Sequence, residues 1–116
     1  MSSIRELRRS AEVGHPAHQM YALVNDVESY PLFLPWCVSA RVLERRPDAV
    51  LATLEMSLAG IHRAVTTQNL LEPPGRVTLE LVEGPFSHFH GQWSFTDLSG
   101  SPARSRVTLE LSYALM

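Results

Sequence analysis

The sequence predicts an α+β domain built on a curved antiparallel sheet of about seven strands. Seven segments alternate with a period of two, and in all but residues 61–69 the apolar residues gather on one face, a pattern typical of strands with one covered face. Short turns rich in glycine and proline join the last six of these segments, which favours antiparallel neighbours. One segment near the N-terminus repeats its apolar residues with the helical period instead. We expect this helix to cover part of the sheet.

Length and charge limit what the chain can be. Its 116 residues suffice for one domain with one core. The formal net charge is −2 and all ten cationic residues are arginine, so any contact with RNA or anionic lipid must be local. The sequence has no apolar run long enough for a transmembrane helix and no apolar signal region at its start. A cytoplasmic chain is therefore expected, with peripheral contact at the inner face of the membrane left open.

The first two elements are a strand and a helix. Residues 3–13 alternate as a strand whose apolar face also carries Arg9. A break at Gly14 follows, and Pro16 suits the first position of a helix because it lacks an N–H. The apolar stripe predicted to pack on the sheet comprises Met20, Leu23, Val24 and Val27.

Residues 25–36 form the most unusual stretch of the chain. Pro31 permits a short helix, whereas Pro35 disfavours helix at Leu34, so a helix of about one turn is expected. Six apolar residues among seven positions are too many for an exposed loop: Tyr30, Leu32, Phe33, Leu34, Pro35 and Trp36. We interpret the stretch as a lid that closes an apolar cavity under the sheet.

Six strands are expected after the lid. The first begins at Cys37, whose sulfur is expected to be a small buried hydrophobe. In the strand around Gly91, Phe89 and Trp93 share one face, and the glycine leaves a gap that would let the sheet curl around a cavity. The last strand carries Val107, Leu109, Leu111, Tyr113 and Leu115 on one face.

Several motifs together resemble the START-like (SRPBCC) superfamily. They lie at residues 20–35, 59–61, 83–86 and 93–95. The nearest members are the coenzyme Q-binding proteins and the bacterial ribosome-association toxin (RatA) family. The resemblance implies a helix-grip fold, in which the sheet wraps a long C-terminal helix and a tunnel between them holds a hydrophobic ligand. The elements run in β-α-α-β6 order, and the sequence stops where that helix would begin. We therefore expect residues 1–116 to form one START-like domain truncated before the C-terminal helix.

The sequence gives little support for catalysis or metal binding. His88 and His90 have a spacing used in metal sites, but no third ligand is placed beside them. No nucleophile elbow or phosphate-cradling glycine loop is present. Neither an enzyme nor a metal site is expected. Arg9 could pair with Glu110 or Glu80 across the sheet, or could hydrogen-bond a ligand oxygen.

The leading hypothesis is non-catalytic binding of a polyprenyl quinone, resembling ubiquinone, in support of respiration. It rests on the resemblance and on the apolar lid, and no cofactor beyond this lipid is expected. Each residue taken alone is better explained as plain core, and the case for a cavity rests on the residues taken together. The predicted cavity residues are Phe33, Leu34, Trp36, Leu54, Met56, Phe86, Phe89, Gly91, Trp93, Leu109 and Leu111.

Three alternatives stay open. The toxin branch implies a protein that binds the large ribosomal subunit and blocks subunit joining, and a polyketide cyclase or dehydrase on the same fold is the weaker rival. A bare inner face would also favour self-association of the truncated chain. Outward arginines could pair with ribosomal phosphates: Arg5, Arg8, Arg41, Arg45 and Arg46.

Overall fold

The computed structural model describes residues 4–32, 34–58, 61–100 and 103–115. Its elements follow the predicted order of one strand, two short helices and six strands. They are β1 (Arg5–Val13), α1 (Ala17–Asn25), the 3-10 helix η1 (Val27–Leu32), β2 (Cys37–Arg46), β3 (Ala49–Leu58), β4 (Ile61–Glu72), β5 (Arg76–Glu83), β6 (Phe86–Leu98) and β7 (Arg104–Leu115).

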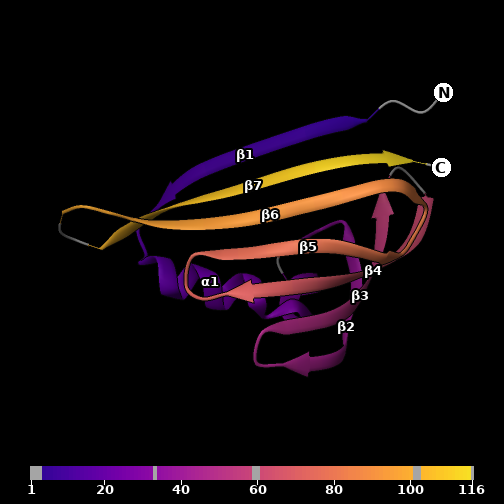
Figure 1. Cartoon of the computed structure of the whole chain (residues 1–116), viewed down its shortest axis with the longest axis horizontal. Coiled ribbons are helices and arrows are strands. Elements are labelled where there is room, and N and C mark those ends of the chain that lie inside the picture. The colour runs from indigo at the N-terminus through magenta and orange to yellow at the C-terminus, as the bar shows by residue number, and fades with distance from the viewer. Residues whose placement is uncertain (1–3, 33, 59–60, 101–102, 116) are drawn as a thin grey trace.

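The strands form one antiparallel sheet of seven in the order β1-β7-β6-β5-β4-β3-β2. Consecutive strands from β2 to β7 are neighbours, and β1 joins beside β7, so the first and last strands lie side by side (Figure 1). The sheet bends strongly, and both helices lie on its concave side, which we call the inner face (Figure 1). β1 and β2 are thus the two edges. The predicted fold class is confirmed.

Helix α1 covers one end of the inner face. Its residues Ala17, Tyr21 and Val24 are buried against Val77 and Phe95 of the sheet. The Tyr21 and Phe95 rings meet edge to face, with centroids 5.7 Å apart.

The predicted apolar stripe of this helix was wrong at Leu23, which is 44% exposed. Since an α-helix turns by about 100° per residue, a face centred on positions 17, 21 and 24 points residue 23 away from the sheet. Val27 of the predicted stripe is buried, but it lies in η1.

Helix η1 packs at the other end, under β2 and β3. Val27 contacts the fully buried Val50 and Ala52. The predicted short helix exists, but it begins at Val27 and contains Pro31, where we expected it to begin near that proline. Leu32 is 85% exposed, so the prediction that every apolar residue of the lid would be covered was wrong. It ends η1 and points away from the sheet.

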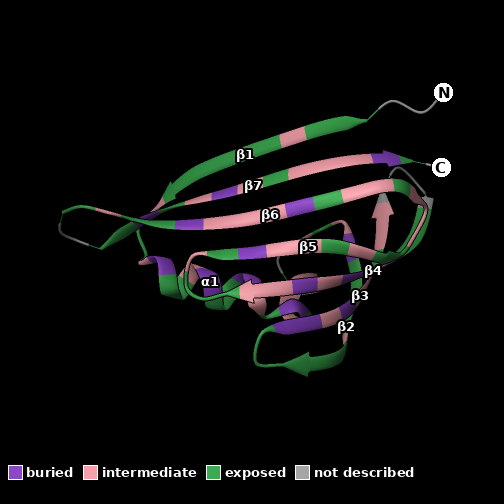
Figure 2. Ribbon diagram, in the orientation of Figure 1, coloured by how far each residue is buried: buried purple, intermediate pink, exposed green. Residues whose placement is uncertain are grey.

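The predicted strand faces are largely correct. Figure 2 shows that β1 is almost wholly exposed, whereas every other strand carries at least one buried position. The alternation of apolar and polar residues after Cys37 predicts that Val38 shares a face with Ala40 and Val42. Val38 is instead 49% exposed, because a register shift between Cys37 and Ser39 rotates it off the inner face. Cys37 itself is buried, as predicted.

Candidate functional site

The inner faces of β6 and β7 form an apolar surface that α1 covers only at one end. Trp93 lies opposite Leu109, and Gly91 lies opposite Leu111. The side chains of Trp93, Leu109, Leu111 and Phe89 are half-buried. These predicted cavity residues therefore share one continuous surface.

A bulge extends this surface with three aromatic rings. The register between β6 and β7 shifts between Phe86 and His88, so Phe86 lies beside Phe89 although they are an odd number of residues apart. Their ring centroids are 5.1 Å apart, and the Tyr113 ring meets Phe86 edge to face at 6.3 Å. The predicted set contained both phenylalanines but not Tyr113, which the alternation of β7 had already placed on this face.

Gly91 does not leave the gap that the sequence suggested. A Cβ built there would lie 2.8 Å from Leu111 Cδ2 and 3.1 Å from Leu79 Cδ1. The space over this glycine is filled by the leucines of the two neighbouring strands. Gly91 thus permits close packing of Leu79 and Leu111, and this correction moves any ligand site away from that position.

The second group of predicted residues lies at the β2 and β3 end. Leu54 and Met56 are half-buried on β3, and β4 and β5 separate them from the β6 and β7 surface. The end of the lid is anchored there, because the Ser57 amide of β3 donates to Trp36 O at 2.9 Å. Phe33 lies outside the described residues. The structure thus divides the predicted set into two groups.

Two hollows lie on the outer face. The larger, of about 380 Å³, is lined by Glu6, Leu7, Arg8, His90, Gln92, Glu110, Leu111 and Ser112. A smaller one of about 240 Å³ is bounded mainly by polar residues of β2 to β4. Of the predicted cavity residues, only Leu111 lines one of these two hollows, the larger one. The use of the inner face by a ligand stays a prediction.

A buried polar pair interrupts the apolar inner face and was missed from the sequence. Thr67 and Asn69 of β4 are 7% and 6% exposed, and the Thr67 hydroxyl donates to Asn69 Oδ1 at 2.9 Å. Asn69 lies opposite Val50 on β3 and Leu79 on β5. The only signal in the sequence was the spacing of two residues, which places Thr67 and Asn69 on the same strand face as Val65, an apolar residue that points inward.

Other enclosed polar atoms lie close to α1. The hydroxyl of Tyr21 and Oδ1 of Asn25 are buried and have no hydrogen-bond partner among the described residues, and the same holds for Ser105 Oγ on β7. Tyr30 donates its hydroxyl to the Val24 carbonyl, which ties η1 to α1. Burial raises the pKa of both tyrosines, with nearby Cys37 and Asp26 adding to the rise at Tyr30.

Arg9 does not make the ion pair suggested by the sequence. It lies opposite Leu109 on the inner side of β1, whereas Glu110 lies opposite Arg8 and Glu80 lies opposite His90. Both carboxylates therefore belong to the outer face, and the predicted pairing was wrong. The Arg9 guanidinium donates to Arg8 O at 3.0 Å instead.

The five arginines proposed for ribosome contact lie at opposite edges of the sheet. Arg5 and Arg8 belong to β1, and the other three belong to β2. Arg46 is already paired with Glu44 at 2.9 Å. Within the described ranges, Arg5 and Arg8 make no ion pair with a carboxylate. The five residues therefore form two separate groups.

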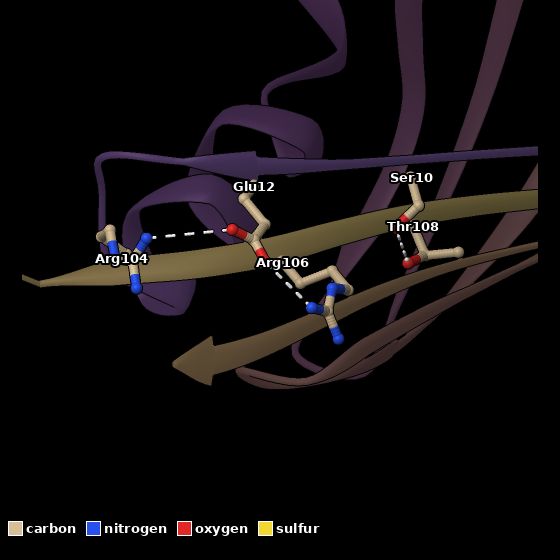
Figure 3. Close-up of polar contacts among 5 residues, drawn as sticks. All are labelled: Ser10, Glu12, Arg104, Arg106 and Thr108. Carbon is tan, nitrogen blue, oxygen red and sulfur yellow. Dashed lines mark hydrogen bonds and ion pairs between the residues drawn. The ribbon is translucent and has the colours of Figure 1, made fainter. Parts of the chain in front are cut away.

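Two arginines that the sequence did not single out extend the β1 edge. Arg104 and Arg106 of β7 lie on either side of Glu12 (Figure 3). The nearest guanidinium nitrogens of the two arginines are 3.8 and 2.9 Å from the carboxylate oxygens of Glu12. Two guanidinium groups share this one carboxylate, which leaves a net positive charge at that end of the edge. Further along, the hydroxyls of Ser10 and Thr108 lie 3.0 Å apart (Figure 3).

The histidines and the cysteine that the structure describes make few side-chain contacts with one another or with nucleophiles; His62 Nε2 lies 3.4 Å from Ser57 Oγ on the exposed surface. His88 Nε2 is hydrogen-bonded to Ser112 Oγ at 2.9 Å on the outer face. In the part of the chain that the structure describes, no group of three or more metal-ligating residues comes together. Burial raises the pKa of the Cys37 thiol, which makes it a poor nucleophile. None of the described helices is long and apolar enough to cross a membrane.

Comparison with known families decides the classification. The sequence profile described as "Polyketide cyclase / dehydrase and lipid transport" matches residues 13–116. The chain belongs to this family. Solved structures agree in fold: the Zhui aromatase/cyclase from Streptomyces superposes with a TM-score of 0.86 at 20% identity, over 98% of this chain and 70% of that one. A START superfamily protein from Mycobacterium smegmatis gives a TM-score of 0.82 at 20% identity, over 96% of this chain and 77% of that one.

Curated relatives include two kinds of named protein. The Ribosome association toxin RatA of Escherichia coli is 42% identical over 108 residues, which cover 93% of this chain and 68% of that protein. RatA of Vibrio cholerae is 39% identical over 96% of this chain and 77% of its own length. The mitochondrial Coenzyme Q-binding protein COQ10 homolog B of Xenopus laevis is 30% identical over 84% of this chain and 41% of its own length. The resemblance to the START-like superfamily is confirmed.

Proposed function

We propose that this chain associates with the ribosome, through its large subunit. The observation that carries the proposal is the 42% identity to a Ribosome association toxin RatA across 93% of the chain. The chain carries a net charge of −2, so attraction to RNA must come from a local group of arginines.

The β1 edge is the surface of this chain that suits such a contact. Exposed edge strand β1 carries Arg8 on its outer side and Arg5 and Arg9 on its inner side. Arg104 and Arg106 of the neighbouring strand β7 lie at one end of the same edge. Guanidinium groups bind phosphate oxygens in a two-pronged geometry that lysine lacks. The β2 edge is less free, since Glu44 already neutralises Arg46 there.

Co-sedimentation with separated large and small ribosomal subunits tests the proposal. The chain should pellet with large subunits at low salt and be released as salt rises, because each phosphate contact displaces counterions. Pelleting with neither subunit at low salt would contradict the proposal.

Binding of a hydrophobic molecule resembling ubiquinone is a second candidate. It is favoured by the half-buried aromatic and leucine surface of β6 and β7 and by the relative named as a Coenzyme Q-binding protein. Organic extraction of purified protein and titration with a short-chain quinone test it. Absence of quinone in the extract, together with no binding in the titration, would exclude it.

Cyclase chemistry is the weakest alternative. The likeness to the Zhui aromatase/cyclase, at 20% identity, concerns the fold alone. Such chemistry needs an acid and a base placed on the inner face, whereas the described histidines His88 and His90 lie on the outer side.

A further inference from the structure

We propose that Asn69 is the hydrogen-bond anchor of a ligand site on the inner face. The ligand class is a neutral, largely apolar molecule that carries a carbonyl oxygen, such as a quinone or a ketone. The inference rests on the second candidate function, and it adds the residue that would orient the molecule.

The position of Asn69 is the first argument. Its register partners are Val50, which belongs to the core beneath η1, and Leu79, which packs against the core beneath α1. Asn69 therefore lies between the two hydrophobic clusters, on the same face as both helices. An amide in such surroundings is normally fully hydrogen-bonded.

The orientation of the amide is the second argument. Thr67 donates its hydroxyl to Oδ1 of Asn69 at 2.9 Å, which occupies the acceptor side of the amide. The Nδ2 group carries two N–H donors, and within the described residues no acceptor binds them. The pair thus presents donors to a guest, and a carbonyl oxygen is the acceptor that complements them.

Tyr21, in the helical layer that packs on the sheet, brings a second donor to the inner face. Tyr21 of α1 is 8% exposed, its hydroxyl is enclosed, and no described residue pairs with it. Tyr21 belongs to the cluster against which Leu79, the neighbour of Asn69, is packed. Burial raises the pKa of Tyr21, so its hydroxyl stays protonated and can donate. Donors without a partner thus come from both layers, and no charged group takes part, which favours a neutral guest.

Titration calorimetry of the full chain with two probes tests the inference. The probes are a 1,4-benzoquinone with a decyl chain and decylbenzene, which has the same chain but no carbonyl oxygen. Asn69→Leu removes the donors at similar volume and should weaken quinone binding by about three- to tenfold, as expected for one hydrogen bond. It should leave decylbenzene binding unchanged. Thr67→Val frees the amide to turn and should weaken quinone binding in the same direction.

Gln68→Leu is the matched control, because it makes the same kind of change one residue away, on the opposite face of β4. It should bind both probes like the parent chain. Unchanged quinone affinity in Asn69→Leu would overturn the inference and assign the free donors to water. If Asn69→Leu does not fold, Thr67→Val decides alone, and parent-like quinone affinity in that variant overturns the inference. If the parent binds neither probe, the ligand candidate itself fails; binding of both probes with no effect of the variants rejects the anchor alone.

Discussion

Gly91 shows how one missing side chain shapes the inner face. Leu79 and Leu111 close over it, and a Cβ would lie 2.8 Å from Leu111. Gly91→Ala should therefore lower the free energy of unfolding by about 1 to 3 kcal/mol, the usual cost of overpacking a core. Gly14 is the matched control, because a Cβ there would meet nothing within 4 Å. Urea denaturation of both variants measures the difference, and equal midpoints would show that the leucines move aside freely.

Tyr30 and Cys37 make stability sensitive to alkaline pH. Burial raises the pKa of both groups above their ordinary values of 10.0 and 9.0, so the folded state favours the protonated forms. Their contribution to stability is complete below those ordinary values and is lost as the pH rises above them. The free energy of unfolding should thus fall above about pH 9.

Tyr30→Phe isolates the tyrosine part of this effect. The variant loses the hydrogen bond to the Val24 carbonyl, which should cost about 1 kcal/mol at neutral pH. Its unfolding free energy should also fall less steeply in alkaline solution than that of the parent. A parallel decline in both proteins, measured by urea denaturation at several pH values, would mean that Tyr30 does not titrate differently on folding.

At the scale of elements, helix α1 depends on a cap from a distant strand. Pro16 at its N-terminus offers no side-chain hydrogen bond, and the Ala17 amide donates to Asp97 Oδ1 of β6 at 2.8 Å. Asp97→Ala should destabilise the protein by about 1 kcal/mol, the usual loss for a helix cap. Asp48→Ala, an exposed turn aspartate, should change stability by less than about 0.5 kcal/mol. Thermal unfolding that is unaffected in Asp97→Ala would show that α1 is held by packing alone.

The strands could be predicted from the sequence because apolar and polar residues alternate wherever neighbouring strands pair in a regular register. The prediction from this alternation failed at two of the four register shifts between paired strands, where Val38 leaves the inner face and Phe86 joins Phe89. A bulge adds one residue to one strand, and no change of composition marks it. The Asp97 cap was also out of reach, since it joins segments 80 residues apart.

At the scale of the whole molecule, the predicted sheet, its order of elements and its helical cover are correct. The candidate sites were predicted less well, because they depend on how strands at a distance are arranged. The arginines divide between the β1 and β2 edges, and the predicted cavity residues divide into two groups separated by β4 and β5. Thr67 and Asn69 went unnoticed because polar residues in an alternating strand indicate a solvated face.

The central claim is that arginines of the β1 edge bind the ribosome, and paired charge reversals at the two edges test it most directly. The variants are Arg5→Glu with Arg8→Glu on β1, and Arg41→Glu with Arg45→Glu on β2, which make the same change of charge. In co-sedimentation with large subunits across a salt series, the β1 variant should lose most of its binding, and its salt dependence should become shallower by about one unit per lost phosphate contact. The β2 variant should sediment like the parent. Equal losses in both variants would assign the effect to net charge, and a loss confined to the β2 variant would contradict the account.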